Sequence, residues 1–141
     1  MANAYALRQR VSERERLAIE GDYYQFVEGD TEKAAVTHEL RVRTHPRDWD
    51  ANHSLATAYR GLGQWELALA PAFAANRLAP DIAATYENLG TIYISVGRFE
   101  DAAATYKAAD DRKLSERTMA RSRYQLAFLQ GDAQAMAHWA A

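Results

Sequence analysis

The chain has 141 residues, of which 48% are hydrophobic, and a formal net charge of -2 at pH 7. This size suits one globular domain or one short repeat array, and the charge provides no overall positive field for nucleic acid or anionic lipid. The lack of cysteine excludes disulfides, thiolate metal sites and thiol nucleophiles. No apolar stretch reaches about 18 residues, so the sequence predicts no membrane insertion.

The strongest pattern in the sequence is a repeat of 34 residues. Gly29, Gly63, Gly97 and Gly131 follow one another at this step, and glycine adopts positive φ after a helix at little cost. Other positions keep the same step: Ala34, Ala68 and Ala102; Pro46 and Pro80; Leu55 and Leu89; Tyr59 and Tyr93; Trp65 and Phe99; Ala75 and Ala109. A period of this length indicates a solenoid built from one repeated supersecondary unit.

We expect an all-α chain, because alanine is frequent and β-branched residues do not alternate along the sequence. Ser12 and Glu15 form an S-x-x-E capping box, so a helix should begin there. Further N-caps are predicted at Asp30, Asp48, Asp81, Ser115 and Asp132. The predicted helices span residues 13–28, 31–44, 49–62, 65–78, 83–96, 99–112, 116–130 and 132–140. Pro71 falls inside one of them and predicts a kink on its solvent-facing side.

The repeating unit resembles the tetratricopeptide repeat (TPR), with its pattern W-x2-L-G-x2-Y, then A-x3-F, then P. The best match, residues 83–116, contains Tyr86, Leu89, Gly90, Tyr93, Gly97, Phe99, Ala102, Tyr106 and Ala109. The resemblance implies a right-handed α-solenoid of stacked antiparallel helix pairs. We expect a single TPR domain over 1–141, with units near 15–48, 49–82, 83–116 and 117–141. The expected core includes Leu55, Tyr59, Trp65, Ala68, Leu89, Tyr93, Phe99 and Ala102.

The two ends of the chain carry expectations of their own. Residues 1–12 are interpreted as the tail of a preceding helix, since Ala4 and Leu7 fall at core positions of the 34-residue register. This segment should dock against the first full helix through Tyr5 and Leu7, and the array should continue upstream. At the other end, Trp139 is expected to cover apolar surface.

A catalytic or metal site is not expected. His38, His45, His53 and His138 lie in no H-E-x-x-H pattern and lack a third ligand, so we interpret them as surface residues. Neighbouring carboxylates such as Glu100 and Asp101 diverge on a helix, which is poor geometry for acid–base work. Phosphate-binding and nucleophile-elbow motifs are absent. The sequence therefore predicts no enzyme, no cofactor and no metal.

The TPR resemblance implies binding of a protein or peptide partner on a concave face lined by the first helix of each pair. The expected partner-binding residues are Tyr23, His53, Thr57, Arg60, Asn88, Thr91, Arg121 and Gln125. Family members that grip chaperone tails use a basic pair, which this register lacks, so such recognition is not expected. Replacing Asn88 and Arg121 together by alanine should weaken binding.

A finer resemblance leaves a second function open. The stretch Leu7–Tyr24, with residues 29–34 and 45–48, looks like the TPR tails of bacterial receptor-like Ser/Thr protein kinases and related transcriptional regulators. That resemblance implies a regulatory or self-associating segment, including a homodimer, within a larger signalling protein. The location would be cytoplasmic by default and extracytoplasmic in a receptor-like kinase.

Overall fold

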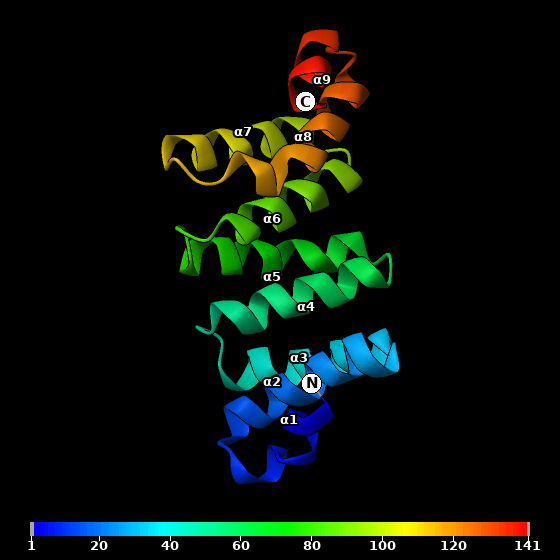
Figure 1. The fold of residues 1–141 in the computed structure, drawn as a ribbon, viewed down its shortest axis with the longest axis vertical. Helices are drawn as coiled ribbons and strands as arrows, with labels where there is room; N and C mark the ends of the chain where they lie inside the picture. The colour runs from blue at the N-terminus through cyan, green and yellow to red at the C-terminus, as the bar shows by residue number, and fades with distance from the viewer. Residues whose placement is uncertain (1, 141) are drawn as a thin grey trace. The chain divides into compact units, whose positions relative to one another are not determined.

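The computed structural model describes residues 2–140, and this part of the chain is all-helical (Figure 1). The chain forms two compact units, an N-terminal unit Met1–Leu78 and a C-terminal unit Ala79–Ala141. The N-terminal unit contains α1 (Ala2–Ala6), a 3-10 turn (Arg8–Arg10), α2 (Glu13–Tyr23), a π-helical turn (Tyr24–Glu28), α3 (Thr31–Thr44), α4 (Trp49–Gly61) and α5 (Trp65–Leu78). The C-terminal unit contains α6 (Ala83–Ser95), α7 (Phe99–Asp111), α8 (Glu116–Gln130) and α9 (Ala133–Trp139).

The repeating glycines end the first helix of each pair. All four adopt the left-handed conformation, with φ between 70° and 76°, at Gly29, Gly63, Gly97 and Gly131. A side chain would be strained there, which explains why glycine recurs at this position. The predicted all-α fold is confirmed, and the observed helix bounds lie within two residues of the predicted ones when the π-helical turn is counted with α2.

Side chains cap the N-termini of several helices by accepting hydrogen bonds from backbone amides. The capping box of Ser12 and Glu15 is complete, with both reciprocal hydrogen bonds present. The predicted caps at Asp30, Asp48 and Asp132 are also confirmed. The prediction for Asp81 is wrong, because its carboxylate accepts instead from Arg112 Nη1 at 2.8 Å. Ser115 occupies the N-cap position of α8 without a side-chain cap bond.

Helix pairs are the packing units of both halves. In the N-terminal unit α2 packs on α3, α3 on α4 and α4 on α5. In the C-terminal unit α6 packs on α7, α7 on α8 and α8 on α9, and the first helices α6 and α8 also touch each other. The core of the C-terminal unit contains Tyr86, Ile94, Ala102, Tyr106, Ala109, Met119 and Leu126. The right-handed sense of the array stays a prediction.

The expected core residues divide into two groups. Four are fully buried: Leu55, Ala68, Leu89 and Ala102. The four aromatic residues, Tyr59, Trp65, Tyr93 and Phe99, are only partly buried. Tyr59 shows one reason, because its hydroxyl reaches Glu39 Oε1 at 2.6 Å and so needs access to the surface. A partly buried ring loses less on truncation than the 3–5 kcal/mol typical of full burial.

In two of the helix pairs, an aromatic ring of the second helix packs directly against a glycine of the first helix. A Cβ added to Gly90 would overlap the Tyr106 ring, and one added to Gly21 would overlap the His38 ring. The interpretation of His38 as a surface residue is therefore wrong, since its side chain is 0% exposed. The repeat contained the signal, because His38 and Tyr106 are two periods apart.

The prediction that Pro71 lies on a solvent-facing side is also wrong. Pro71 is buried, and α5 runs through it without a break. It belongs to the stripe of Ala68, Ala72 and Ala75, whose spacing of three and four residues defines one helix face. The proline ring thus contributes apolar surface to the packed side of α5.

The N-terminal segment docks through Tyr5, as predicted. Its ring stacks on Tyr23 with the centroids 3.8 Å apart, and the Arg8 guanidinium lies 3.8 Å from the Tyr5 centroid. The chain turns before Ser12, so this segment is not continuous with α2. The docking role of Leu7 is wrong, because α1 ends at Ala6 and Leu7 lies 53% exposed in the turn.

The contact between Gly21 and His38 leads to a stability prediction. Gly21→Ala should lower the free energy of unfolding by about 1–3 kcal/mol, because the new methyl group must displace a buried ring. Gly61→Ala is the matched control, since its Cβ would meet only the Thr31 methyl at 3.1 Å. This control should stay within about 1 kcal/mol of the wild type. Urea denaturation measures both, and equal effects would contradict the close approach.

His38 also predicts a pH dependence. Burial lowers the pKa of His38 to about 4, whereas an unfolded histidine titrates near 6.5. The unfolded chain therefore takes up a proton first as the pH falls, so stability is lost below pH 6.5. We expect a loss of about 2 kcal/mol between pH 6.5 and 5 that is missing in His38→Gln. Denaturant titrations at both pH values check this, and parallel losses in the two proteins would contradict it.

Candidate protein-binding surfaces

The expected binding residues of the N-terminal unit lie on α2 and α4. His53, Thr57 and Arg60 follow one another at helical spacing on α4, so the structure brings these three to one face. All three are partly buried, and the Thr57 hydroxyl donates to the His53 carbonyl at 2.9 Å. Tyr23 on α2 is covered on one side by the Tyr5 ring. Tyr23 is partly buried, as are the three residues on α4.

The expected binding residues of the C-terminal unit differ in their exposure to solvent. Arg121 and Gln125 are exposed on α8, and Thr91 on α6 is partly buried, with its hydroxyl donating to Glu87 Oε1 at 3.1 Å. Asn88 is only 1% exposed, which corrects its assignment to an open binding surface. It belongs to the buried stripe of α6 formed by Thr85, Asn88, Leu89 and Ile92.

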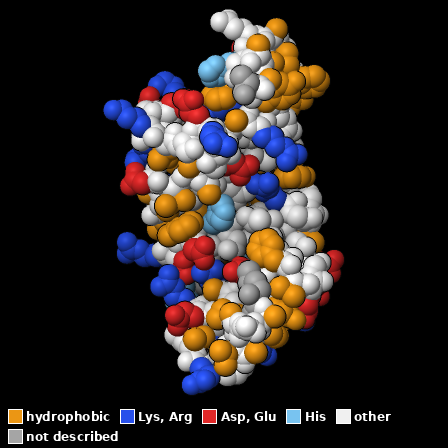
Figure 2. Space-filling model, viewed as in Figure 1, with side chains coloured by type: hydrophobic (Ala, Val, Ile, Leu, Met, Phe, Trp, Pro, Cys, Tyr) orange, Lys and Arg blue, Asp and Glu red, His pale blue; other side chains and the backbone are white. Residues whose placement is uncertain are grey.

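The exposed side of α8 also carries large apolar side chains. Phe128 is 64% exposed, Leu129 48% and Tyr124 40%. Arg121, Gln125 and Phe128 follow at steps of four and three residues, so they share a face, which we call the α8 face. Figure 2 shows hydrophobic side chains gathered over α8 and α9, which Figure 1 labels. Exposed apolar patches of this kind mark interaction surfaces.

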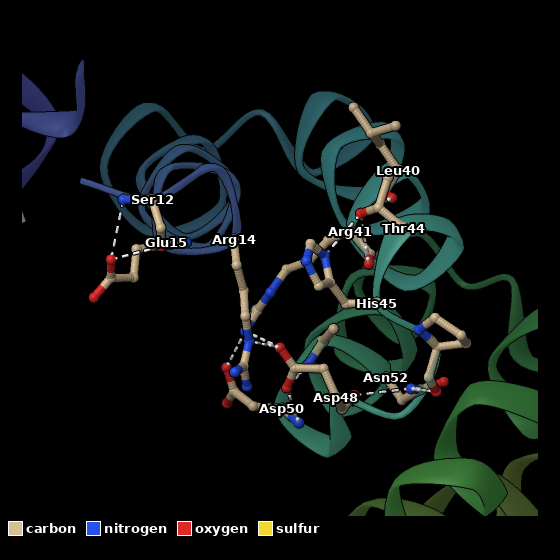
Figure 3. A network of polar contacts seen from close by, with 12 residues as sticks. Ser12, Arg14, Glu15, Leu40, Arg41, Thr44, His45, Asp48, Asp50 and Asn52 are labelled. Carbon is tan, nitrogen blue, oxygen red and sulfur yellow. Dashed lines mark hydrogen bonds and ion pairs between the residues drawn. The ribbon is translucent and has the colours of Figure 1, made fainter. Parts of the chain in front are cut away.

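A buried ion network fixes the start of α4 against the preceding helices (Figure 3). Arg41 is 3% exposed, and its Nη2 donates to Asp48 Oδ2 at 3.2 Å and to Asp50 Oδ2 at 2.7 Å. Arg14 Nε donates to the same Asp48 oxygen at 2.9 Å. The other Asp48 oxygen accepts from the backbone amides of Asp50 and Ala51. One carboxylate therefore joins α2, α3 and α4.

The charge on Asp48 is maintained although the side chain is buried. Burial raises the pKa of Asp48, but the hydrogen bonds from Arg14 and the Ala51 amide and the charge of Arg41 together outweigh it, so the net pKa is lowered. A buried carboxylate with several donors remains ionised for this reason. Asp48 thus acts in this network as an ionised acceptor of several hydrogen bonds.

Arg123 has the corresponding role in the C-terminal unit. Its guanidinium binds both oxygens of Asp110, at 3.0 and 2.5 Å, and donates to the Tyr106 carbonyl at 3.0 Å. The Trp139 ring centre lies 4.7 Å from the same guanidinium. Trp139 was expected to cover apolar surface; its ring lies over this buried cation and lines a cavity with Leu126 and Ala127. The contact holds α9 to α7 and α8.

Other kinds of site are missing from the described part of the chain. Between residues 2 and 140, no cluster of three or more His, Cys, Asp or Glu side chains is arranged to hold a metal ion. Within the same range, no helix has both the length and the apolar composition needed to cross a bilayer. The candidate sites are therefore surfaces of helices and turns.

Helix pairs, left-handed turn glycines and ring-on-glycine packing together define a TPR-like fold. One solved structure to which the chain is similar is "MamA MSR-1 C2", which comes from a TPR-containing protein. The two agree with a TM-score of 0.78 at 18% identity, over 98% of this chain and 82% of that one. At this identity the likeness concerns the fold alone.

The comparisons at the level of sequence give no match. No family model matches the chain, and no curated protein does. The resemblance to the tails of receptor-like kinases and transcriptional regulators finds no support in the comparisons. What they support is a TPR-like fold.

The Asp48 network predicts unequal effects of two similar substitutions. Asp48→Ala should lower the free energy of unfolding by about 3–5 kcal/mol, because it leaves Arg41 buried without its partner. Asp30→Ala is the matched control, since Asp30 caps α3 through the Lys33 amide but is exposed. Loss of an ordinary cap costs about 1 kcal/mol. Guanidinium denaturation distinguishes the two, and equal losses would mean that Asp48 acts only as a cap.

Proposed function

We propose that the chain is a protein-interaction scaffold that binds an extended segment of a partner protein on its first-helix faces. The α8 face is the main contact in this proposal. The observation that carries it is the exposure of Arg121, Gln125 and Phe128 side by side on one helix. The TPR-like fold supports the general class of function, and no catalytic role is proposed.

The chemistry of the α8 face suits a peptide backbone with carboxylate and apolar side chains. Arg121 offers a planar set of donors that matches a carboxylate. Gln125 can donate to and accept from a partner's backbone amides. Phe128 supplies an apolar anchor, and residues of the aromatic and arginine types dominate binding energy at interfaces. His53, Thr57 and Arg60 on α4 are a separate candidate surface within the N-terminal unit.

Self-association is the alternative that a specific observation favours. The exposed side chains of Phe128, Leu129 and Tyr124 could be covered by a second copy of the chain. Light scattering after size exclusion separates the two functions. A monomer at all concentrations supports partner binding, whereas a dimer that is lost in Phe128→Ser supports self-association.

The proposal predicts how α8 variants behave toward a partner. A photo-crosslinking amino acid in place of Gln125 should capture the partner from an extract of the source organism. Arg121→Ala combined with Phe128→Ser should then weaken binding of that purified partner by at least about tenfold, as loss of interface anchors does. Both residues are exposed, so the thermal melting followed by circular dichroism should not change.

Lys107→Ala is the control for the loss of a surface cation, since Lys107 is exposed on α7. It should leave the affinity unchanged. Titration calorimetry measures all three proteins with the captured partner. Unaltered affinity in the double variant would remove α8 from the interface.

A further inference from the structure

A second surface, on different residues, surrounds the turn between α3 and α4. Two cavities share Pro46 there. One, of about 350 Å³, is lined by Arg14, His45, Pro46, Arg47 and Asp48. The other, of about 290 Å³, is lined by Pro46, Phe73, Ala74, Arg77 and Leu78. We call these residues together the Pro46 surface; all of them lie in the N-terminal unit.

We propose that the Pro46 surface binds a short acidic segment of a partner protein that carries one apolar side chain. The apolar side chain would enter the cavity beside Phe73, and the flanking carboxylates would pair with Arg47 and Arg77. This site is independent of the α8 face.

The apolar part of the surface is already formed and open. Phe73 is 49% exposed and Leu78 38% exposed, and Pro46 between the two cavities is also exposed. Sites for complete small ligands usually measure about 300–1,000 Å³. The cavity beside Phe73 is slightly smaller than this range, so it suits a single side chain of a peptide better than a cofactor.

Within residues 2–140, two exposed arginines of the surface have no carboxylate partner. Arg47 and Arg77 are exposed, and within residues 2–140 no carboxylate lies within ion-pair distance of either guanidinium. The nearby Asp48 is already bound by Arg14 and Arg41. Two arginines beside an apolar cavity complement carboxylates that flank an apolar residue.

The turn that carries the surface is held in one conformation. The buried Asn52 donates through Nδ2 to the carbonyl of Pro46 at 3.2 Å and to that of Asp48 at 2.9 Å. The Asp48 amide donates to the His45 carbonyl at 3.0 Å. Figure 3 shows Asn52 and Asp48 at this turn, with Arg14 and His45 nearby. Because the turn is already ordered before binding, a ligand does not pay the entropy cost of ordering it.

The same features argue against other anionic partners. Nucleic acid is bound mainly through many phosphate contacts, whereas this surface offers two arginines without a carboxylate partner in the described part of the chain. They lie beside an apolar cavity, one of them 5.9 Å from the Phe73 ring centre. The chain also has a net charge of -2. Anionic membranes attract clusters of four to eight basic residues. An acidic peptide with an apolar residue matches both halves of the surface.

The test uses the full chain and a fluorescein-labelled hexapeptide, DEEFDE, followed by fluorescence anisotropy at low salt. DEEADE, without the aromatic anchor, and QNNFNQ, without the carboxylates, are the matched probes. We expect DEEFDE to bind more tightly than either by about tenfold, and to weaken as salt is raised. Arg47→Glu with Arg77→Glu should weaken it by at least about tenfold, and Phe73→Ser should reduce it to the level of DEEADE.

Lys107→Glu with Lys113→Glu makes the same change of charge at two exposed residues outside both proposed surfaces and is the matched control. It should leave DEEFDE binding within about twofold of the wild type at moderate salt, where distant charges are screened. All variants change exposed residues, and melting curves verify their folding.

The proposal is overturned if DEEFDE fails to bind, or if the Lys107 and Lys113 control loses binding as the Arg47 and Arg77 variant does. Binding of duplex DNA and of phosphatidylglycerol vesicles is measured with the same Arg47 and Arg77 variant. A loss of binding confined to these two probes would also overturn the proposal.

Discussion

The close approach of the two helices in a pair depends on a ring lying against a residue without a side chain. In the C-terminal unit the Tyr106 ring occupies the space that a Cβ on Gly90 would need, and in the N-terminal unit His38 does the same at Gly21. Interiors are packed too tightly for such a contact to adjust without loss. The separation of the helices in these two pairs, α2 with α3 and α6 with α7, therefore depends on this contact.

Ion networks provide the second level of order within each unit. Arg41 and Asp48 connect α3 to the start of α4, and Arg123 with Asp110 connects α8 to α7. Each places a buried guanidinium on a carboxylate, an arrangement that destabilises strongly when one member is removed. Because these charges are already paired inside the protein, the residues left for recognition are the exposed ones, such as Arg47, Arg77 and Arg121.

Local signals in the sequence predicted the helices and turns well. The binding surfaces were harder to predict, because they depend on which face of a helix each residue occupies. The turn glycines and the capping box at Ser12 act through the backbone of a few neighbouring residues, so their effect can be predicted from the sequence alone. The register of the TPR family places Asn88 on an open surface, yet its position on the stripe of Leu89 and Ile92 buries it. The Pro46 surface combines a turn with the end of α5, and no periodicity in the sequence joins those segments.

The ring-on-glycine contact should show a direct energetic coupling if it sets the geometry of a helix pair. A double-mutant cycle with Gly90→Ala and Tyr106→Ala, measured by chemical denaturation, tests this role most directly. Removal of the ring should make room for the new methyl group, so the double variant should be less destabilised than the sum of the single variants. We expect a coupling on the order of 1–3 kcal/mol, as found for residues in direct contact. Additive losses, with coupling below about 0.5 kcal/mol, would contradict this role of the contact.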